Sequence, residues 1–192
     1  MSALVQPGTL LLSAPEMLDP NFMHTVVLLV DHSDEGAFGL VVNRPIDARV
    51  RDAFPGHDHL GSVDLRLRTG GPVGGETLQI LHRLPAHTVH GETRGAELAP
   101  GVFVGGDIDV IAQLLDDPHE MDPRVRFVVG YSGWGAGQLE AEIAQDAWVP
   151  LPATPELVFS ADDTEVLWRR ALRSVEGGGS SLASLPPDPS WN

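Results

Sequence analysis

The stretch "HTVVLLVDHSDEGAFGLVVN", residues 24–43, decides the fold of this chain. Its first half is apolar at successive positions, which predicts a strand at the centre of a sheet that is covered on both faces. The link "SDEG" has the length of a hairpin connection, and the next run predicts an antiparallel partner over residues 37–43. Pro45 ends that partner, because proline has no N–H to donate to a central ladder.

Further elements extend from this hairpin in both directions. Strand, helix and strand over residues 101–131 predict one βαβ unit, in which Asp107 is the expected N-cap of the helix. Because strands dominate the first half and helices the second, we expect an α+β fold with a mixed sheet. The expected strands are 8–14, 24–32, 37–43, 63–68, 77–82, 101–106 and 124–131, the helices 107–117, 137–148 and 162–174, and the loops 69–75 and 83–100.

The composition excludes several kinds of chemistry. The 192 residues hold no cysteine and no lysine, which excludes disulfides, thiolate metal sites, Schiff bases and the lysine of a nucleotide-binding loop. The net charge of −15 disfavours direct binding to nucleic acid, because an acidic surface repels the phosphate backbone. No apolar run approaches the ~20 residues of a membrane-spanning helix, so we expect no membrane contact and a cytoplasmic protein.

A glycine-rich stretch, "GYSGWGAGQLE" at residues 130–140, follows an expected strand and leads into an expected helix. It fails as a phosphate-binding P-loop, because Ala136 and Gly137 stand where lysine and serine or threonine belong. It also fails as a hydrolase elbow around Ser132, since Trp134 replaces the second glycine and no histidine follows. We expect mainly a structural turn anchored by Trp134, with an anion site on the backbone amides and an exposed stacking tryptophan as alternatives.

Other polar groups raise weaker hypotheses. The histidine pairs in "HDH" (57–59) and "HTVH" (87–90) have generic spacing, so no metal site and no cofactor is expected. The region 44–68 is unusual, because it holds five of the twelve arginines, although four aspartates nearly cancel their charge. Arg44 lies at a strand end before Pro45, where it is expected either to pair with an acid or to bind an anion.

The order of several motifs resembles the AlgH/YqgE family of bacterial proteins. They are the run from "LLLSAPEM" through "VVNRP", "GGPV" followed by "LH", and "GYSGWGAGQLEAEI" followed by "AW". The resemblance implies an α+β fold with a branched mixed sheet that includes a small closed barrel and is flanked by helices. It implies no catalytic residues and no cofactor, and family members often carry the label of transcriptional regulators. We expect one domain over residues 1–174 and a disordered tail over 175–192.

The function that fits these observations is that of a non-enzymatic binding or regulatory protein, which acts through a protein partner or a small ligand. One alternative is a hydrolase-like or anion-handling enzyme that uses a cleft near residues 130–138, and another is a regulator that binds DNA directly, which the net charge of −15 disfavours. No catalytic residue is assigned. The side chains expected to converge on a ligand-binding cleft are Asn43, Arg44, His82, Tyr131, Trp134 and Gln138.

Overall fold

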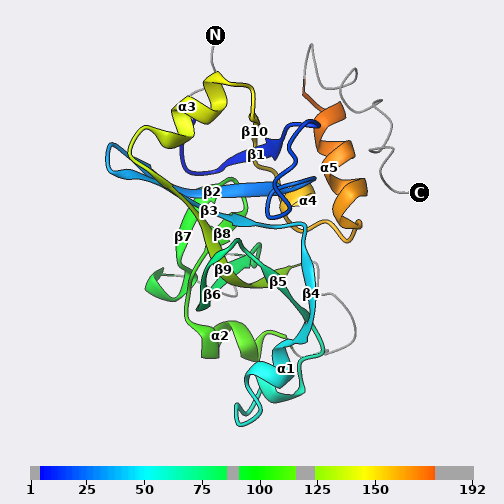
Figure 1. Cartoon of the computed structure of the whole chain (residues 1–192). Helices are drawn as coiled ribbons and strands as arrows, with labels where there is room; N and C mark the ends of the chain where they lie inside the picture. The colour runs from blue at the N-terminus through cyan, green and yellow to red at the C-terminus, as the bar shows by residue number, and fades with distance from the viewer. Residues whose placement is uncertain (1–4, 86–90, 116–123, 176–192) are drawn as a thin grey trace, which may run out of the picture.

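The computed structural model describes residues 5–85, 91–115 and 124–175, and its main feature is one strongly curled sheet of ten strands. Figure 1 shows β10, β1, β2 and β3 across the upper part of the molecule and β9, β6, β5 and β4 below them. The strands are β1 (Thr9–Ser13), β2 (Val26–Ser33), β3 (Gly36–Val41), β4 (Pro45–Arg49), β5 (Arg66–Thr69), β6 (Val73–His82), β7 (Ala96–Ala99), β8 (Val102–Val104), β9 (Val125–Gly135) and β10 (Trp148–Pro152).

The expected central hairpin is confirmed in β2 and β3. The two strands pair in antiparallel register from Val27 opposite Val41 to Ser33 opposite Gly36. Alternate residues of β2 enter two different hydrophobic clusters: Leu28 packs in one, and Leu29 packs in the other. The strand is therefore covered on both faces, as its uninterrupted apolar run predicted.

Strand β9 is the branch point of the sheet. One edge pairs with β6, while the other edge pairs first with β5 in parallel and then with β3 in antiparallel register. The sheet is therefore branched and mixed, as expected. The closed barrel implied by the family resemblance is not shown, because the strand order β10-β1-β2-β3-β9-β6-β8-β7 is open and, within the described residues, β4 pairs only with β5. A barrel closes only when its first and last strands pair.

The glycine-rich stretch is mostly strand, which corrects the expected loop. Strand β9 continues to Gly135, and Gly137, with φ +71°, takes the left-handed conformation before the next helix. Pairing with β3 overrides the weak strand propensity of these glycines, because Ser132 lies opposite Gly39 and Trp134 opposite Ala37. The turn at the end of this stretch is therefore shorter than its composition suggested.

Several other elements depart from the sequence prediction, and β4, α1 (Val50–Ala53) and α4 (Pro155–Val158) are among those that were not expected. Strand β6 begins inside the expected loop 69–75, and β7 lies inside the expected loop 83–100. Strand β10, "WVPLP", was not predicted; it holds two prolines, and its first residue, Trp148, falls in the expected helix 137–148. It lies at the edge of the sheet and pairs only with β1 among the described strands, so the missing proline N–H groups interrupt no central ladder.

The helices are few and short. The expected βαβ unit exists, but β6 lies between β8 and β9 and is antiparallel to both. Asp107 caps α2 as expected, and its Oδ1 accepts hydrogen bonds from Asp109 N at 3.0 Å and Val110 N at 3.1 Å. No described helix is long and apolar enough to cross a membrane. The α-helices are α1 (Val50–Ala53), α2 (Ile108–Gln113), α3 (Gln138–Ala144), α4 (Pro155–Val158) and α5 (Thr164–Arg173), and the 3-10 turns are Leu60–Ser62 and Gly91–Arg94.

Helix α5 lies beside the upper strands, at the right in Figure 1. Its Leu167, Trp168 and Leu172 are buried in the cluster that also contains Leu28. This packing places the start of α5, and the segment before it, next to the antiparallel pair of strands β4 and β5. The tail expected over residues 175–192 lies outside the described residues except for Val175, which packs against the same cluster.

Candidate functional site

Asn43 and Arg44 both hold neighbouring backbone in place. Asn43 is buried, its Oδ1 accepts from Val26 N at 2.9 Å, and its Nδ2 donates to the carbonyl oxygens of His24 and Thr164 at 2.9 and 2.8 Å. The Thr164 hydroxyl donates in return to the Asn43 carbonyl at 2.6 Å, so this residue ties the end of β3 to the start of α5.

Arg44 bonds the loop before β2. Its guanidinium donates to the carbonyl oxygens of Pro20, Asn21 and Met23 at 3.2, 2.7 and 2.9 Å. Burial lowers the pKa of this guanidinium, and the charge of Asp19 acts in the opposite direction. The described contacts of Arg44 include no direct acid pair, and its guanidinium bonds a set of backbone carbonyls instead.

His82 lies at a different place, at the end of β6. The ring is fully buried and stacks on Phe103 at 5.2 Å between centroids. Its Nε2 lies 2.7 Å from the Arg94 carbonyl oxygen and its Nδ1 lies 3.3 Å from Leu84 N, which defines a neutral ring with the proton on Nε2. Burial lowers the pKa of His82, in agreement with this neutral form.

Trp134 and Gln138 are the expected site residues that the structure brings together, and they meet at Glu142. Trp134 Nε1 donates to Oε2 of Glu142 at 2.9 Å, and Gln138 Nε2 donates to Oε1 at 2.9 Å. A second indole, from Trp148, donates to the same Oε2 at 2.7 Å. We call Trp134, Gln138, Glu142 and Trp148 the indole corner. Trp134 is only 6% exposed, which supports the anchor and not the stacking platform.

Tyr131 and Ser132 complete the expected residues of β9. Tyr131 is half-buried and packs edge-on against Phe38 at 5.7 Å. Ser132 is fully buried, and its hydroxyl donates to the Gly70 carbonyl at 3.0 Å. Neither residue contacts Asn43, Arg44 or His82 through a described hydrogen bond.

The histidines considered as metal ligands do not gather into a cluster within the described residues. His57 Nε2 lies 3.0 Å from Asp109 Oδ1, which fastens the loop after α1 to α2. The second histidine pair, at residues 87–90, lies outside the described residues. Within the described part of the chain, no group of three or more metal-binding side chains is present.

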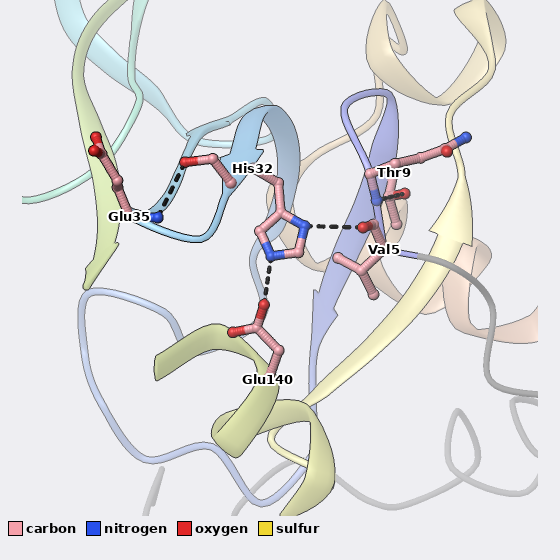
Figure 2. A network of polar contacts seen from close by, with 7 residues as sticks. Val5, Thr9, His32, Glu35 and Glu140 are labelled. Atoms are coloured by element: carbon pink, nitrogen blue, oxygen red, sulfur yellow. Dashed lines mark hydrogen bonds and ion pairs between the residues drawn. The ribbon is translucent and has the colours of Figure 1, made fainter. Parts of the chain in front are cut away.

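A polar network beside α3 involves His32 (Figure 2). Its Nδ1 lies 2.9 Å from the Val5 carbonyl oxygen, and its Nε2 lies 2.6 Å from Oε1 of Glu140. Both partners are acceptors, so both ring nitrogens must carry a proton. Burial alone would lower the pKa of His32, but the hydrogen bonds to Glu140 and Val5 raise it above its ordinary value. The network joins the start of the described chain to α3.

A pocket suited to a ligand lies elsewhere among the described residues, beside the antiparallel pair β4–β5. Alternation along the chain into β5 buries Leu65 and Leu67 in the core and places Arg66 and Arg68 on the opposite face. Pro45 lies opposite Arg68 in the ladder, and Arg49 lies opposite Arg66. A pocket of about 340 Å³, which we call the arginine pocket, is lined by Pro45, Arg49, Arg66, Arg68, Ala161, Asp162 and Asp163.

Arg68 is the unusual group in this pocket. Its side chain is 4% exposed, its Nε has no hydrogen-bond partner, and it forms no ion pair with any described residue. Burial lowers the pKa of its guanidinium, and no charged neighbour contributes to that shift. Arg66 is exposed and also has no described side-chain partner, whereas Arg49 Nε lies 3.7 Å from Asp64 Oδ1. A buried cation without a partner is expensive unless something else compensates its charge.

The opposite wall of the arginine pocket is the segment that leads into α5. Arg126 Nη2 donates to the carbonyl oxygens of Phe159 and Ser160 at 2.6 and 3.2 Å. Arg170 Nη1 lies 2.6 Å from Asp162 Oδ2. Together with the bond between Asn43 and Thr164, these contacts fasten the segment on both sides of the lining residues.

Comparison with known proteins places this fold. The family model described as AlgH-like matches residues 10–179. The chain belongs to the AlgH-like family. A UPF0301 protein from Chlorobaculum tepidum is 37% identical over 98% of this chain and 97% of its own length, and one from Chlamydia caviae is 33% identical over 96% and 94%.

Two solved structures share the architecture. A protein from Corynebacterium diphtheriae superposes with a TM-score of 0.73 at 24% identity, covering 95% of this chain and 94% of its own, which shows the fold alone. The AlgH protein from Pseudomonas aeruginosa superposes with a TM-score of 0.66 at 29% identity and covers 97% of both chains. The names of these AlgH-like proteins state no activity, so the function must be argued from the site.

The arginine pocket of this AlgH-like chain was only half visible in the sequence. The concentration of arginines between residues 44 and 68 is visible in the sequence, and the alternation of "VDLRLR" is that of a half-exposed strand, in which Arg66 and Arg68 share one face. The partner wall at Ala161–Asp163 follows roughly a hundred residues later and carries no motif. Glu142 was also missed, although its spacing of four from Gln138 on one helix face was a usable signal.

Proposed function

We propose that this protein binds a small anionic ligand in the arginine pocket and acts as a non-enzymatic binding or regulatory protein. The observation that carries the proposal is the Arg68 guanidinium, which is buried, faces the pocket and has no described partner. An anion in the pocket would compensate its charge, and Arg49 and Arg66 supply further donors on the same wall.

The chemistry of the lining favours binding over catalysis. Guanidinium groups remain protonated at neutral pH and therefore serve poorly as general acids or bases. Asp162 is already engaged by Arg170. The alternative of an enzyme cleft near residues 130–138 has less support. Trp134 and Gln138 donate hydrogen bonds to Glu142, and Ser132 donates to a backbone carbonyl. Direct DNA binding remains disfavoured by the net charge of −15.

The proposal is tested by titrating the protein with inorganic phosphate in a calorimeter at low ionic strength. We expect saturable binding with one site, and we expect Arg68→Met to weaken it by about 10- to 100-fold, the size of one charge-assisted hydrogen bond. Arg173→Met is the matched control, since Arg173 is exposed at the end of α5 and lies outside the pocket. Absence of phosphate binding by the wild type, or equal losses in both variants, would overturn the proposal.

A further inference from the structure

The charges that line the arginine pocket do not cancel within the described residues. Arg49 is paired with Asp64, and Asp162 is paired with Arg170. Three lining side chains, those of Arg66, Arg68 and Asp163, remain without a described hydrogen bond or ion pair. The pocket thus offers two unpaired cations and, across from them, one unpaired carboxylate.

Asp163 is the group that a simple anion would not use. It occupies the N-cap position of α5, where a carboxylate usually accepts hydrogen bonds from the first turn, yet it makes no such bond. The next residue, Thr164, is held by Asn43 through bonds of 2.8 and 2.6 Å, so the backbone at this point is fixed. The Asp163 side chain is exposed, lines the pocket and is an acceptor without a described partner, and its charge disfavours an occupant that carries only negative charge.

Size and charge narrow the class of ligand. A volume of about 340 Å³ is at the lower end of small-molecule sites, which fits a compact metabolite and not a nucleotide chain or a peptide. Two guanidinium groups without partners match a dianion, and a phosphate monoester carries close to −2 near neutral pH, whereas a single carboxylate carries −1. The carboxylate of Asp163 then requires a donor on the organic part of the same molecule.

We propose that the ligand is a small phosphate monoester whose organic part carries an ammonium or hydroxyl group, with the phosphate on Arg66 and Arg68 and the donor on Asp163. This inference rests on the proposed anion-binding function and adds its selectivity. Asp163 is thus a specificity-determining residue, which rejects phosphate esters that present no donor because its carboxylate would be left facing an anion.

The test compares three probes by calorimetry: inorganic phosphate, ethyl phosphate, and O-phosphoethanolamine, which adds an ammonium group to the ethyl ester. Wild-type protein should bind O-phosphoethanolamine about tenfold or more tightly than ethyl phosphate, the effect of one charge-assisted hydrogen bond. Asp163→Asn should bring the two affinities within about twofold, and it should keep α5 intact because asparagine is an equally good N-cap.

Asp163→Ser, a second N-cap residue, should lose the preference in the same way and keeps the inference testable if one variant folds poorly. Equal affinities for the two esters in wild-type protein, or a preference that survives both substitutions, would overturn the inference while phosphate binding itself stands. If inorganic phosphate and both esters fail to bind the wild type, the proposed function falls as well.

Discussion

The indole corner and the arginine pocket differ in whether their charged group has partners within the protein. In the indole corner the Glu142 carboxylate accepts from two indole N–H groups and from Gln138. In the arginine pocket Arg68 is 4% exposed, slightly less than Trp134 at 6%, but its guanidinium has no described partner. The first region has satisfied its polar groups within the protein, whereas the second has left an interaction open.

This difference separates a structural role from a binding role. The glycine- and tryptophan-rich motif is conspicuous in the sequence. In the indole corner, however, the hydrogen-bonding groups already have partners within the protein and are not available to a ligand. An ordinary alternating strand draws little attention, yet an unsatisfied buried charge costs stability and is retained where another molecule compensates it. Four substitutions test this contrast, beginning with the largest expected effect.

Trp134→Ala should break the indole corner and lower the free energy of unfolding by about 3–5 kcal/mol. The ring is buried against Phe22 and Trp148, at 6.5 and 5.8 Å between centroids, and its removal leaves both a cavity and a weaker set of donors for Glu142. Urea denaturation measures the change. Leu18→Ala, which truncates a side chain that is 75% exposed, is the control and should change stability little.

Asn43→Ala should cost about 2–3 kcal/mol, because the substitution leaves Val26 N and the His24 and Thr164 carbonyls without their partner. The same substitution removes the bond from Asn43 to the Thr164 carbonyl, which we call the clamp, at the start of α5. Phosphate affinity should therefore fall as well, because the clamp holds one wall of the arginine pocket. Asn21→Ala, at an exposed position, serves as the control. Retention of wild-type stability would contradict the clamp.

Arg68→Met should have the opposite sign. Removing an unpaired buried cation while keeping most of its aliphatic stem should raise the free energy of unfolding by about 1 kcal/mol in the absence of ligand. Thermal unfolding in phosphate-free buffer measures this, with Arg173→Met as the control. A clear destabilisation would mean that Arg68 is satisfied within the protein, and the contrast between the two regions would disappear.

The smallest effect concerns pH and the network of His32 with Glu140. The pKa of His32 is raised above 6.5, so its contribution is fully present below that value and is lost as pH rises through the folded pKa. The pKa of Glu140 is lowered from 4.5, first by its own backbone N–H and then by His32, so its contribution is lost only as pH falls through that lower value.

The difference in Tm between wild type and His32→Asn should therefore be largest at pH values between the lowered pKa of Glu140 and the raised pKa of His32. The difference should vanish toward about pH 9. Asp31 adds a smaller favourable charge effect on His32 and stays in place in the variant. His59→Asn, at an exposed position, is the control substitution. A pH-independent difference would show that His32 contributes only packing.

The central hairpin, the cap of α2 and the class of fold were accessible from the sequence because each depends on neighbours along the chain. A doubly apolar run requires cover on both faces, and Asp107 caps the helix that it precedes. The errors in β9, β7 and β10 share one cause. Glycine and proline signal turns locally, but pairing with a distant strand decides whether a residue is extended, as Trp134 opposite Ala37 and Pro150 opposite Leu11 illustrate.

The candidate site shows the same division. Alternation in "VDLRLR" alone determined that Arg66 and Arg68 share one face of a strand, since side chains of a strand point to alternate sides. Only the tertiary structure brought Ala161–Asp163 against that face. Helix α5 buries Leu167 and Trp168 in the cluster that contains Leu28, and this packing fixes the position of the segment before the helix. Whether a charge is paired depends on such distant packing, and no local pattern in the sequence encodes it.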